Sequence, residues 1–199
     1  MISNGGSATD AAASAGELRV SAVDPVAAAT YQTNRLNKSG AFPVRKTALA
    51  AKPADRVLRI TRLFDAPRAA VFAAFVDPKQ ALQWLGPRGY AMTHMEADLR
   101  VGGAWRGCMR ANSGGRELWH GGVYREIAPP ERLAFTFAWE LEDGARDAET
   151  LVTITFEDQG GKTLMQFSQG VFATPEDCEG HRGGWESEFD QLAAFIWRS

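Results

Sequence analysis

Two residues in one short segment, His120 and Tyr124, could move a proton. Imidazole and phenol side chains act as general acids and bases when a fold holds them against a substrate. Gly121-Gly122 lies between them and could form a β-bulge, which would reverse the set of side chains that face inward. We predict that Tyr124 points inward, with His120 as a second polar candidate, although neither residue indicates a particular reaction.

Acidic residues near the C-terminus permit two interpretations. Glu186, Glu188 and Asp190 could supply the acid and the base of a catalytic pair. They fit the solvated face of a helix equally well, because they lie largely outside the apolar stripe of that segment. No Gly-x-Ser-x-Gly elbow or comparable nucleophile signature occurs in the chain, so the sequence favours a protein without catalytic residues.

Histidines and cysteines do not indicate a metal site. The three histidines, His94, His120 and His181, form no His-x-His or His-Glu-x-x-His motif and no pair with a cysteine. A first-row metal needs three or four convergent ligands, so we expect no metal and no cofactor. Cys108 and Cys178 have no redox spacing, which favours free thiols in a reducing cytoplasm.

The segment 97–115, ADLRVGGAWRGCMRANSGG, has five glycines around one tryptophan and looks at first like a nucleotide-binding loop. A phosphate loop needs GxxxxGK[ST] or GxGxxG between a strand and a helix, so that backbone N–H groups face the anion. Here no Lys-Ser/Thr pair follows, and the next residues have a β pattern. The glycines instead predict a bend in a sheet that curves around the final helix.

Composition indicates a globular protein of one domain. The 199 residues carry a net charge of −2, which gives no reason to expect nucleic acid as a partner. No apolar run is long enough to span a bilayer, and the N-terminal residues lack the basic and apolar regions of a secretory signal. We therefore expect a cytoplasmic protein that does not insert into a membrane.

The chain divides near residue 55. Residues 1–55 are rich in Ala, Ser and Gly and contain only two aromatic residues, whereas all six tryptophans follow residue 80. Such a segment buries too little apolar area to offset the entropy lost on folding. We predict a mostly disordered tail over 1–55, in which Asp24-Pro25 could start a short helix around 24–36, and a folded domain over 56–199. A docking arm is the alternative interpretation of the tail.

The predicted domain begins with a strand over 56–64 and two short consecutive helices that meet at Asp77-Pro78. Short turns then join five or six strands, which must pair antiparallel, over 90–101, 102–111, 116–127, 133–140, 150–157 and 163–172. From Pro175 to Trp197 apolar residues recur every three or four positions. This spacing predicts a long amphipathic helix that covers one face of the sheet.

Five blocks of this sequence resemble successive blocks of a known family. They are DAPRAAVFAAFVDPKQALQWLGP, ADLRVGGAWRGCM, GGVYREIAPPERLAFTFAWE, TLVTITFEDQGGKTLMQFSQGVF and HRGGWESEFDQLAAFI. The family comprises homologues of the C-terminal domain of the activator of heat-shock-protein ATPase, within the helix-grip (START-like, SRPBCC) superfamily. The resemblance covers residues 56–199 and implies an α+β fold. In it, an antiparallel sheet of six or seven strands grips the long C-terminal helix and leaves a cavity between them.

Strand alternation and the helical stripe predict the side chains that line this cavity. They are Trp105, Met109, His120, Tyr124, Phe135, Phe137, Trp139, Met165, Phe167, Trp185 and Phe189. Ordinary core packing explains the same apolar residues equally simply. Further candidates for orienting a ligand are Arg106, Gln169 and His94, and Trp84 and Trp119 could line the mouth of the cavity.

Three functions follow as hypotheses. The favoured one is non-catalytic binding of a small hydrophobic molecule, because such pockets are mainly apolar with a few orienting polar groups. The family name suggests regulation of a chaperone ATPase through protein contact, although residues 1–55 are too short for the separate binding domain that this activity would need. The third is a cyclase or aromatase type of enzyme that uses His120 or Tyr124.

Overall fold

The computed structural model describes residues 53–198. Residues 1–52, which hold most of the predicted tail and its helix around 24–36, lie outside the described part of the chain. The described elements, in chain order, are η1 (Pro53–Arg56), β1 (Leu58–Phe64), α2 (Arg68–Val76), α3 (Pro78–Trp84), β2 (Tyr90–Ala97), β3 (Ala104–Ala111), β4 (Glu117–Ala128), β5 (Arg132–Trp139), β6 (Thr150–Asp158), β7 (Thr163–Gly170) and α4 (Pro175–Ile196).

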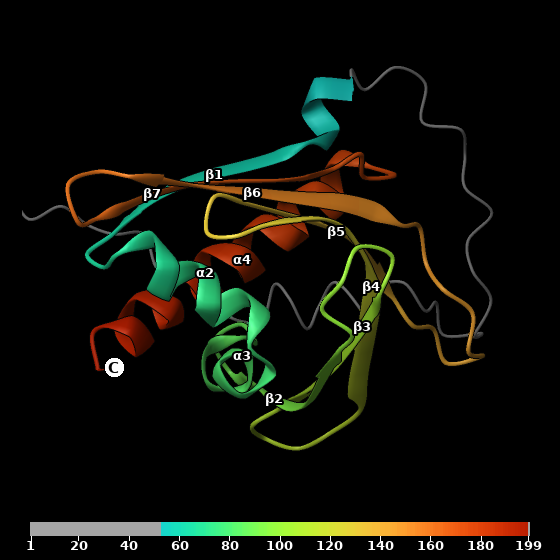
Figure 1. Ribbon diagram of the computed structural model, residues 1–199. Helices are drawn as coiled ribbons and strands as arrows, with labels where there is room; N and C mark the ends of the chain where they lie inside the picture. Colours follow the sequence, from blue (N-terminus) through green and yellow to red (C-terminus); the bar gives the residue numbers. More distant parts are fainter. Residues whose placement is uncertain (1–52, 199) are drawn as a thin grey trace, which may run out of the picture.

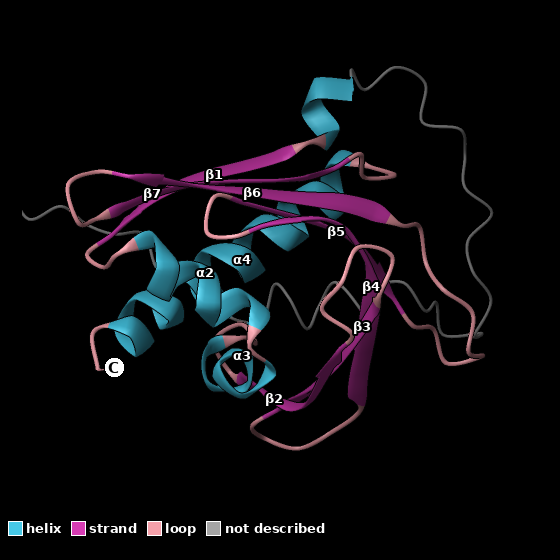
Figure 2. Cartoon of the chain, viewed as in Figure 1, coloured by secondary structure: helices cyan, strands magenta, loops and turns pink. Residues whose placement is uncertain are grey.

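The seven strands form one antiparallel sheet in the order β1-β7-β6-β5-β4-β3-β2. Figure 1 shows that the sheet bends between β5 and β4 and that α4 crosses the concave side. The loops that join the strands lie at the ends of the sheet (Figure 2). This arrangement confirms the predicted α+β helix-grip fold with two short helices after the first strand.

Capping residues set where the helices begin. The Asp77 side chain accepts a hydrogen bond from the N–H of Lys79, at 2.9 Å, and Pro78 follows at the first helical position of α3. Thr174 caps α4 in the same way, because its hydroxyl accepts from the N–H of Asp177 at 3.1 Å. Helices α3 and α4 therefore start where the sequence offers a side-chain acceptor followed by proline, whereas α2 follows Pro67 and has no side-chain cap.

The half of the sheet formed by β1, β7 and β6 has a closely packed inner face. Alternate residues of β6 are buried, and Phe156 makes edge-to-face contacts with Phe72 and Phe75, at 5.6 Å in each case. Phe189 of α4 lies 5.2 Å from Phe167 of β7. These rings fill the space between this half of the sheet and the three helices.

Gly122 of β4 allows the bend in the other half of the sheet. A Cβ atom at this position would lie 1.7 Å from the carbonyl oxygen of Thr136 and 2.8 Å from the indole nitrogen of Trp105. Because glycine has none, the Trp105 indole reaches across β4 and donates to the Thr136 oxygen at 3.1 Å. Gly122 thus serves a close approach of neighbouring strands, whereas Gly102, Gly114 and Gly115 have positive φ in the loops on either side of β3. Strand β4 and not a helix follows this segment, so it lacks the strand-to-helix arrangement of a phosphate loop.

No helix among residues 53–198 combines the length and the apolar character needed to cross a membrane.

Candidate functional site

A cavity lies between α4 and the bent half of the sheet. It has about 980 Å³ of space free of atoms, its open mouth included, and its wall is almost entirely apolar. The lining residues come from α2, the loop after α3, β2 to β5 and α4. They are Phe75, Leu85, Pro87, Tyr90, Met92, Met95, Trp105, Met109, Leu118, His120, Tyr124, Phe135, Phe137, Trp139, Gly180, His181, Gly184, Trp185 and Glu188.

Helix α4 leaves this space open because two of its cavity-facing positions are glycines. Gly180, Gly184 and Glu188 follow one another at four-residue spacing, so they lie along one side of the helix. A Cβ atom built on Gly184 meets nothing within 4 Å. The next turns of α4 carry Phe189 and Leu192, which are buried and close the core beyond the cavity.

Gly184→Ala is expected to stabilise the fold by about 0.5–1 kcal/mol. Glycine is costly inside a helix, and the added methyl group enters free space. Urea unfolding of both proteins measures the difference, and Ala194→Gly on the exposed side of α4 is the matched control, with a loss of similar size. A destabilised Gly184→Ala protein would show that the space beside this glycine is filled.

His120 is the most enclosed polar group of the cavity wall. Its ring stacks on Phe137 at 5.4 Å and meets the edges of Trp105 and Trp139, and the side chain is 5% exposed. Burial lowers the pKa of His120 to about 4, although a 3.4 Å contact of Nδ1 with the Leu118 carbonyl opposes this shift. At neutral pH the ring is therefore uncharged and offers a ligand a nitrogen acceptor or an N–H donor.

Tyr124 also lines the cavity, two inward positions after His120 on β4. Burial raises the pKa of Tyr124 to about 12, so the phenol keeps its proton at neutral pH. The strand has its register shift between Tyr124 and Glu126, beyond the Gly121-Gly122 pair where a bulge was considered. His120 and Tyr124 consequently face the same side of the sheet.

Glu188 is the functional candidate that sequence reasoning left undecided. Its side chain lines the cavity and is only 7% exposed, and one carboxylate oxygen accepts from the N–H of Gly86 at 3.1 Å. Burial raises the pKa of Glu188 from its ordinary value of 4.5 to about 8, and the hydrogen bond from Gly86 only partly opposes the shift. The sequence signal for its location is the four-residue spacing from Gly180 and Gly184, which puts Glu188 on the same side of the helix as these glycines. By contrast, Asp190 is exposed and pairs with Arg62 at 3.1 Å.

The end of the cavity near the start of α4 is closed by Trp139 and His181. The indole N–H of Trp139 donates to Nε2 of His181 at 3.2 Å, and Nδ1 of the same ring donates to the Asp177 carbonyl at 2.9 Å. Because an indole nitrogen can only donate, Nε2 of His181 must be the acceptor and the ring must be neutral. His181 therefore positions Trp139 through this pair of hydrogen bonds.

Three predicted cavity residues belong to the packed core instead. Met165, Phe167 and Phe189 are buried but do not line the cavity. They lie between β7 and the second half of α4, where Phe167 contacts both Trp185 and Phe189. The other eight predicted lining residues, Trp105, Met109, His120, Tyr124, Phe135, Phe137, Trp139 and Trp185, do reach the cavity.

Gln169 does not line the cavity. It is fully buried, its Oε1 accepts from the Trp185 indole at 2.6 Å, and its Nε2 donates to the Thr150 hydroxyl at 2.9 Å. Thr150 in turn donates to the carbonyl of Phe137 at 3.3 Å. This chain of hydrogen bonds fixes the orientation of the Trp185 ring, so Gln169 supports the cavity wall from behind.

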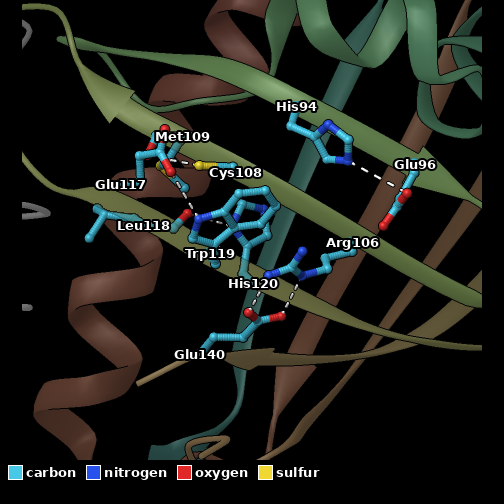
Figure 3. Close-up of polar contacts among 10 residues, drawn as sticks. All are labelled: His94, Glu96, Arg106, Cys108, Met109, Glu117, Leu118, Trp119, His120 and Glu140. Atoms are coloured by element: carbon cyan, nitrogen blue, oxygen red, sulfur yellow. Dashed lines mark hydrogen bonds and ion pairs between the residues drawn. The ribbon is translucent and has the colours of Figure 1, made fainter. Parts of the chain in front are cut away.

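The other polar candidates lie on the outer face of the sheet (Figure 3). Arg106 forms two hydrogen bonds of 2.8 Å with the carboxylate of Glu140, and its guanidinium lies 3.8 Å from the centre of the Trp119 ring. His94 is 5.5 Å from the same ring and 3.6 Å from Glu96. Alternation turns these side chains away from the cavity, so Arg106, His94 and Trp119 cannot contact a ligand there.

Trp84 is not at the mouth of the cavity either. It is fully buried in the core, where its indole donates to the Ala74 carbonyl at 3.0 Å and its ring meets Phe75 at 4.9 Å. Within the described range, 53–198, no three His, Cys, Asp or Glu side chains gather as a set that could hold a metal ion. What the cavity offers chemically is an aromatic wall, neutral His120 and Tyr124, and one buried acid.

Comparisons with solved structures identify proteins with the same fold. A crystal structure from Chromobacterium violaceum is 30% identical, with 71% of this chain and 96% of that chain covered and a TM-score of 0.63. A crystal structure of an AHSA1 protein from Silicibacter pomeroyi is 28% identical, with 71% and 98% covered and a TM-score of 0.65. A solution structure from Arthrobacter aurescens, 21% identical, covers 78% of this chain and 94% of its own, with a TM-score of 0.67.

No curated protein matches the chain. The sequence model described as activator of Hsp90 ATPase homolog 1-like protein matches residues 65–196, from the turn before α2 to the last residue of α4. This range includes every residue of the cavity wall. The chain therefore belongs to the family of activator of Hsp90 ATPase homolog 1-like proteins.

Proposed function

We propose that this protein binds a small hydrophobic molecule in the cavity between α4 and strands β2 to β5, without catalysing a reaction. The observation that carries the proposal is an aromatic-lined space kept open by glycines on the helix that should otherwise fill it. Pockets for small molecules are typically concave, mainly apolar and furnished with a few polar groups. The residues we assign to ligand contact include Trp105, Phe137, Trp139 and Trp185, with His120 and Tyr124 as polar groups.

The pKa values of His120 and Tyr124 favour a role in binding over a role in proton transfer. With a pKa of about 4 for His120 and about 12 for Tyr124, neither side chain exchanges a proton readily near neutral pH. We therefore do not propose the cyclase or aromatase type of reaction. We place the binding activity in the cytoplasm, where Cys108 and Cys178 would stay free thiols.

Titration with N-phenylnaphthylamine, an uncharged aromatic probe that fluoresces in apolar surroundings, tests this proposal. We expect saturable binding by the wild-type protein and binding at least about tenfold weaker by Gly184→Phe, because the new ring occupies the space next to α4. Ala194→Phe places the same ring on the exposed side of α4 and should bind like the wild type. Equal binding by all three proteins, or none by the wild type, would refute a ligand site in the cavity.

Regulation of a chaperone ATPase is the second candidate, because the family is described by an activator of Hsp90 ATPase. This role would use an outer surface of the protein and not its cavity. Assays of the ATPase rate of an Hsp90 chaperone, with and without this protein, decide it. An increase that persists in Gly184→Phe would establish a contact function separate from ligand binding.

A further inference from the structure

Glu188 gives the cavity a charge character that an apolar pocket alone would lack. Only one of its oxygens has a hydrogen-bond donor within the described residues, the N–H of Gly86. Across residues 53–198 no arginine, lysine or histidine pairs with this carboxylate. The carboxyl group therefore lies buried at the cavity wall with one oxygen unused and with no counter-charge.

The rest of the wall also favours a positively charged group over an anion. Among the residues from 53 to 198 no lysine or arginine lines the cavity, and eight of the lining residues carry aromatic rings of the Phe, Tyr or Trp type. The faces of such rings carry partial negative charge and attract cations, most strongly where water is excluded. A buried acid surrounded by these rings is complementary to an ammonium group on an apolar body.

Building on the proposed binding function, we propose that the cavity takes a hydrophobic amine. Its ammonium group donates to the free oxygen of Glu188, and its apolar body contacts the rings of Trp105, Phe137 and Trp185. The hydrogen bond from Gly86 keeps the carboxylate oriented along α4, and Gln191 of the same helix donates to the carbonyl of Gly86. The loop after α3 thus holds the acid in place for the ligand.

The proton balance of binding follows from the state of Glu188 before binding. With a pKa of about 8, Glu188 carries a proton in most molecules at neutral pH. When an ammonium ion enters, the O–H bond of Glu188 breaks, the proton leaves to solvent, and an N–H···O hydrogen bond to the carboxylate forms. Binding should therefore release close to one proton near pH 7 and weaken about tenfold for each pH unit below 8.

Other titratable groups around Glu188 do not account for such a pH dependence. They are Tyr90 on β2, His120 and Tyr124 on β4, and His181 on α4 itself. Burial raises the pKa of both tyrosines and lowers that of His120. His181 is held by hydrogen bonds at both ring nitrogens, and Arg88 in the loop before β2 is exposed.

Three probes of one shape test the proposal: naphthylmethylamine, naphthylmethanol and naphthoic acid, each measured by displacement of N-phenylnaphthylamine. At about pH 8.5 we expect the amine to bind at least about tenfold more tightly than the alcohol, with the acid weakest. This preference should shrink as the pH falls towards about 6. Calorimetry in two buffers near pH 7 should detect the released proton, a readout on the wild-type protein that needs no variant.

Glu188→Gln keeps an oxygen for the N–H of Gly86 but removes the charge, so the ratio of amine to alcohol affinity should fall to about one. Glu149→Gln, an exposed acid in the loop before β6, should leave the ratio unchanged. An equal affinity for amine and alcohol in the wild type, a preference that survives Glu188→Gln, or failure of the amine to displace a bound probe would each overturn the amine assignment. In all three cases binding of N-phenylnaphthylamine would still support the cavity function.

Discussion

Replacing Glu188 by glutamine is expected to stabilise the folded protein at about pH 8.5 by roughly 3–5 kcal/mol. In the folded wild type this buried carboxyl keeps its proton up to a pKa of about 8, whereas the unfolded chain releases it near 4.5. The folded state therefore binds more protons than the unfolded state between these values, and its stability falls as the pH rises. The amide has no proton to lose and should not show this fall.

His120 acts in the opposite direction at lower pH, which makes the profile specific. Its folded pKa of about 4 lies below the ordinary value of 6.5, so stability is lost as the pH falls from 6.5 through 4. Together the two groups predict little change between 4.5 and 6.5 and a decline above 6.5 due to Glu188. Urea unfolding from about pH 5 to pH 9 measures this, with Glu149→Gln as the control. A wild-type profile that stays level from pH 6.5 to 8.5 would contradict the buried acid.

Gly122→Ala is expected to destabilise the protein by about 3 kcal/mol or to prevent folding. The new Cβ atom would overlap the carbonyl oxygen of Thr136 and press on the Trp105 indole, so β4 must move and the hydrogen bond between Trp105 and Thr136 must break. Thermal and urea unfolding give the size of the loss, and far-UV circular dichroism reports whether the sheet forms.

The matched control is a glycine substitution at the cavity wall, Gly184→Ala, which has the opposite expected sign because its methyl group meets open space. If both substitutions destabilise equally, the cost comes from a general intolerance of side chains in this region. A neutral Gly122→Ala would contradict the close packing of β3, β4 and β5 at this residue.

Alternation along a single strand correctly predicted which side chains of β5 face the interior. On β5 it placed Phe135, Phe137 and Trp139 on one face, and all three line the cavity. Alternation assigns a side chain to a face of the sheet, but it does not say where along that face the helix packs closely. For that reason Met165 and Phe167, which alternate in the same way on β7, lie in the filled half of the interior.

Polar residues were harder to place, because their location depends on partners from distant segments. Gln169 has an inward position on β7, but its side-chain amide is already hydrogen-bonded to the Trp185 indole and the Thr150 hydroxyl. Glu188 is an ionisable residue, and its position in the sequence fits a solvated helix face and a catalytic pair equally well. Its burial follows from the N–H of Gly86, 102 residues earlier, which no local pattern can reveal.

A crystal structure of the protein with N-phenylnaphthylamine bound tests the central claim most directly. Our account predicts electron density for the probe between α4 and strands β3 to β5, in contact with Gly184 and with the rings of Trp105 and Phe137. Density for the probe only on the outer surface, or Trp139 and Trp185 turned inward so that they fill the space beside Gly184, would contradict it.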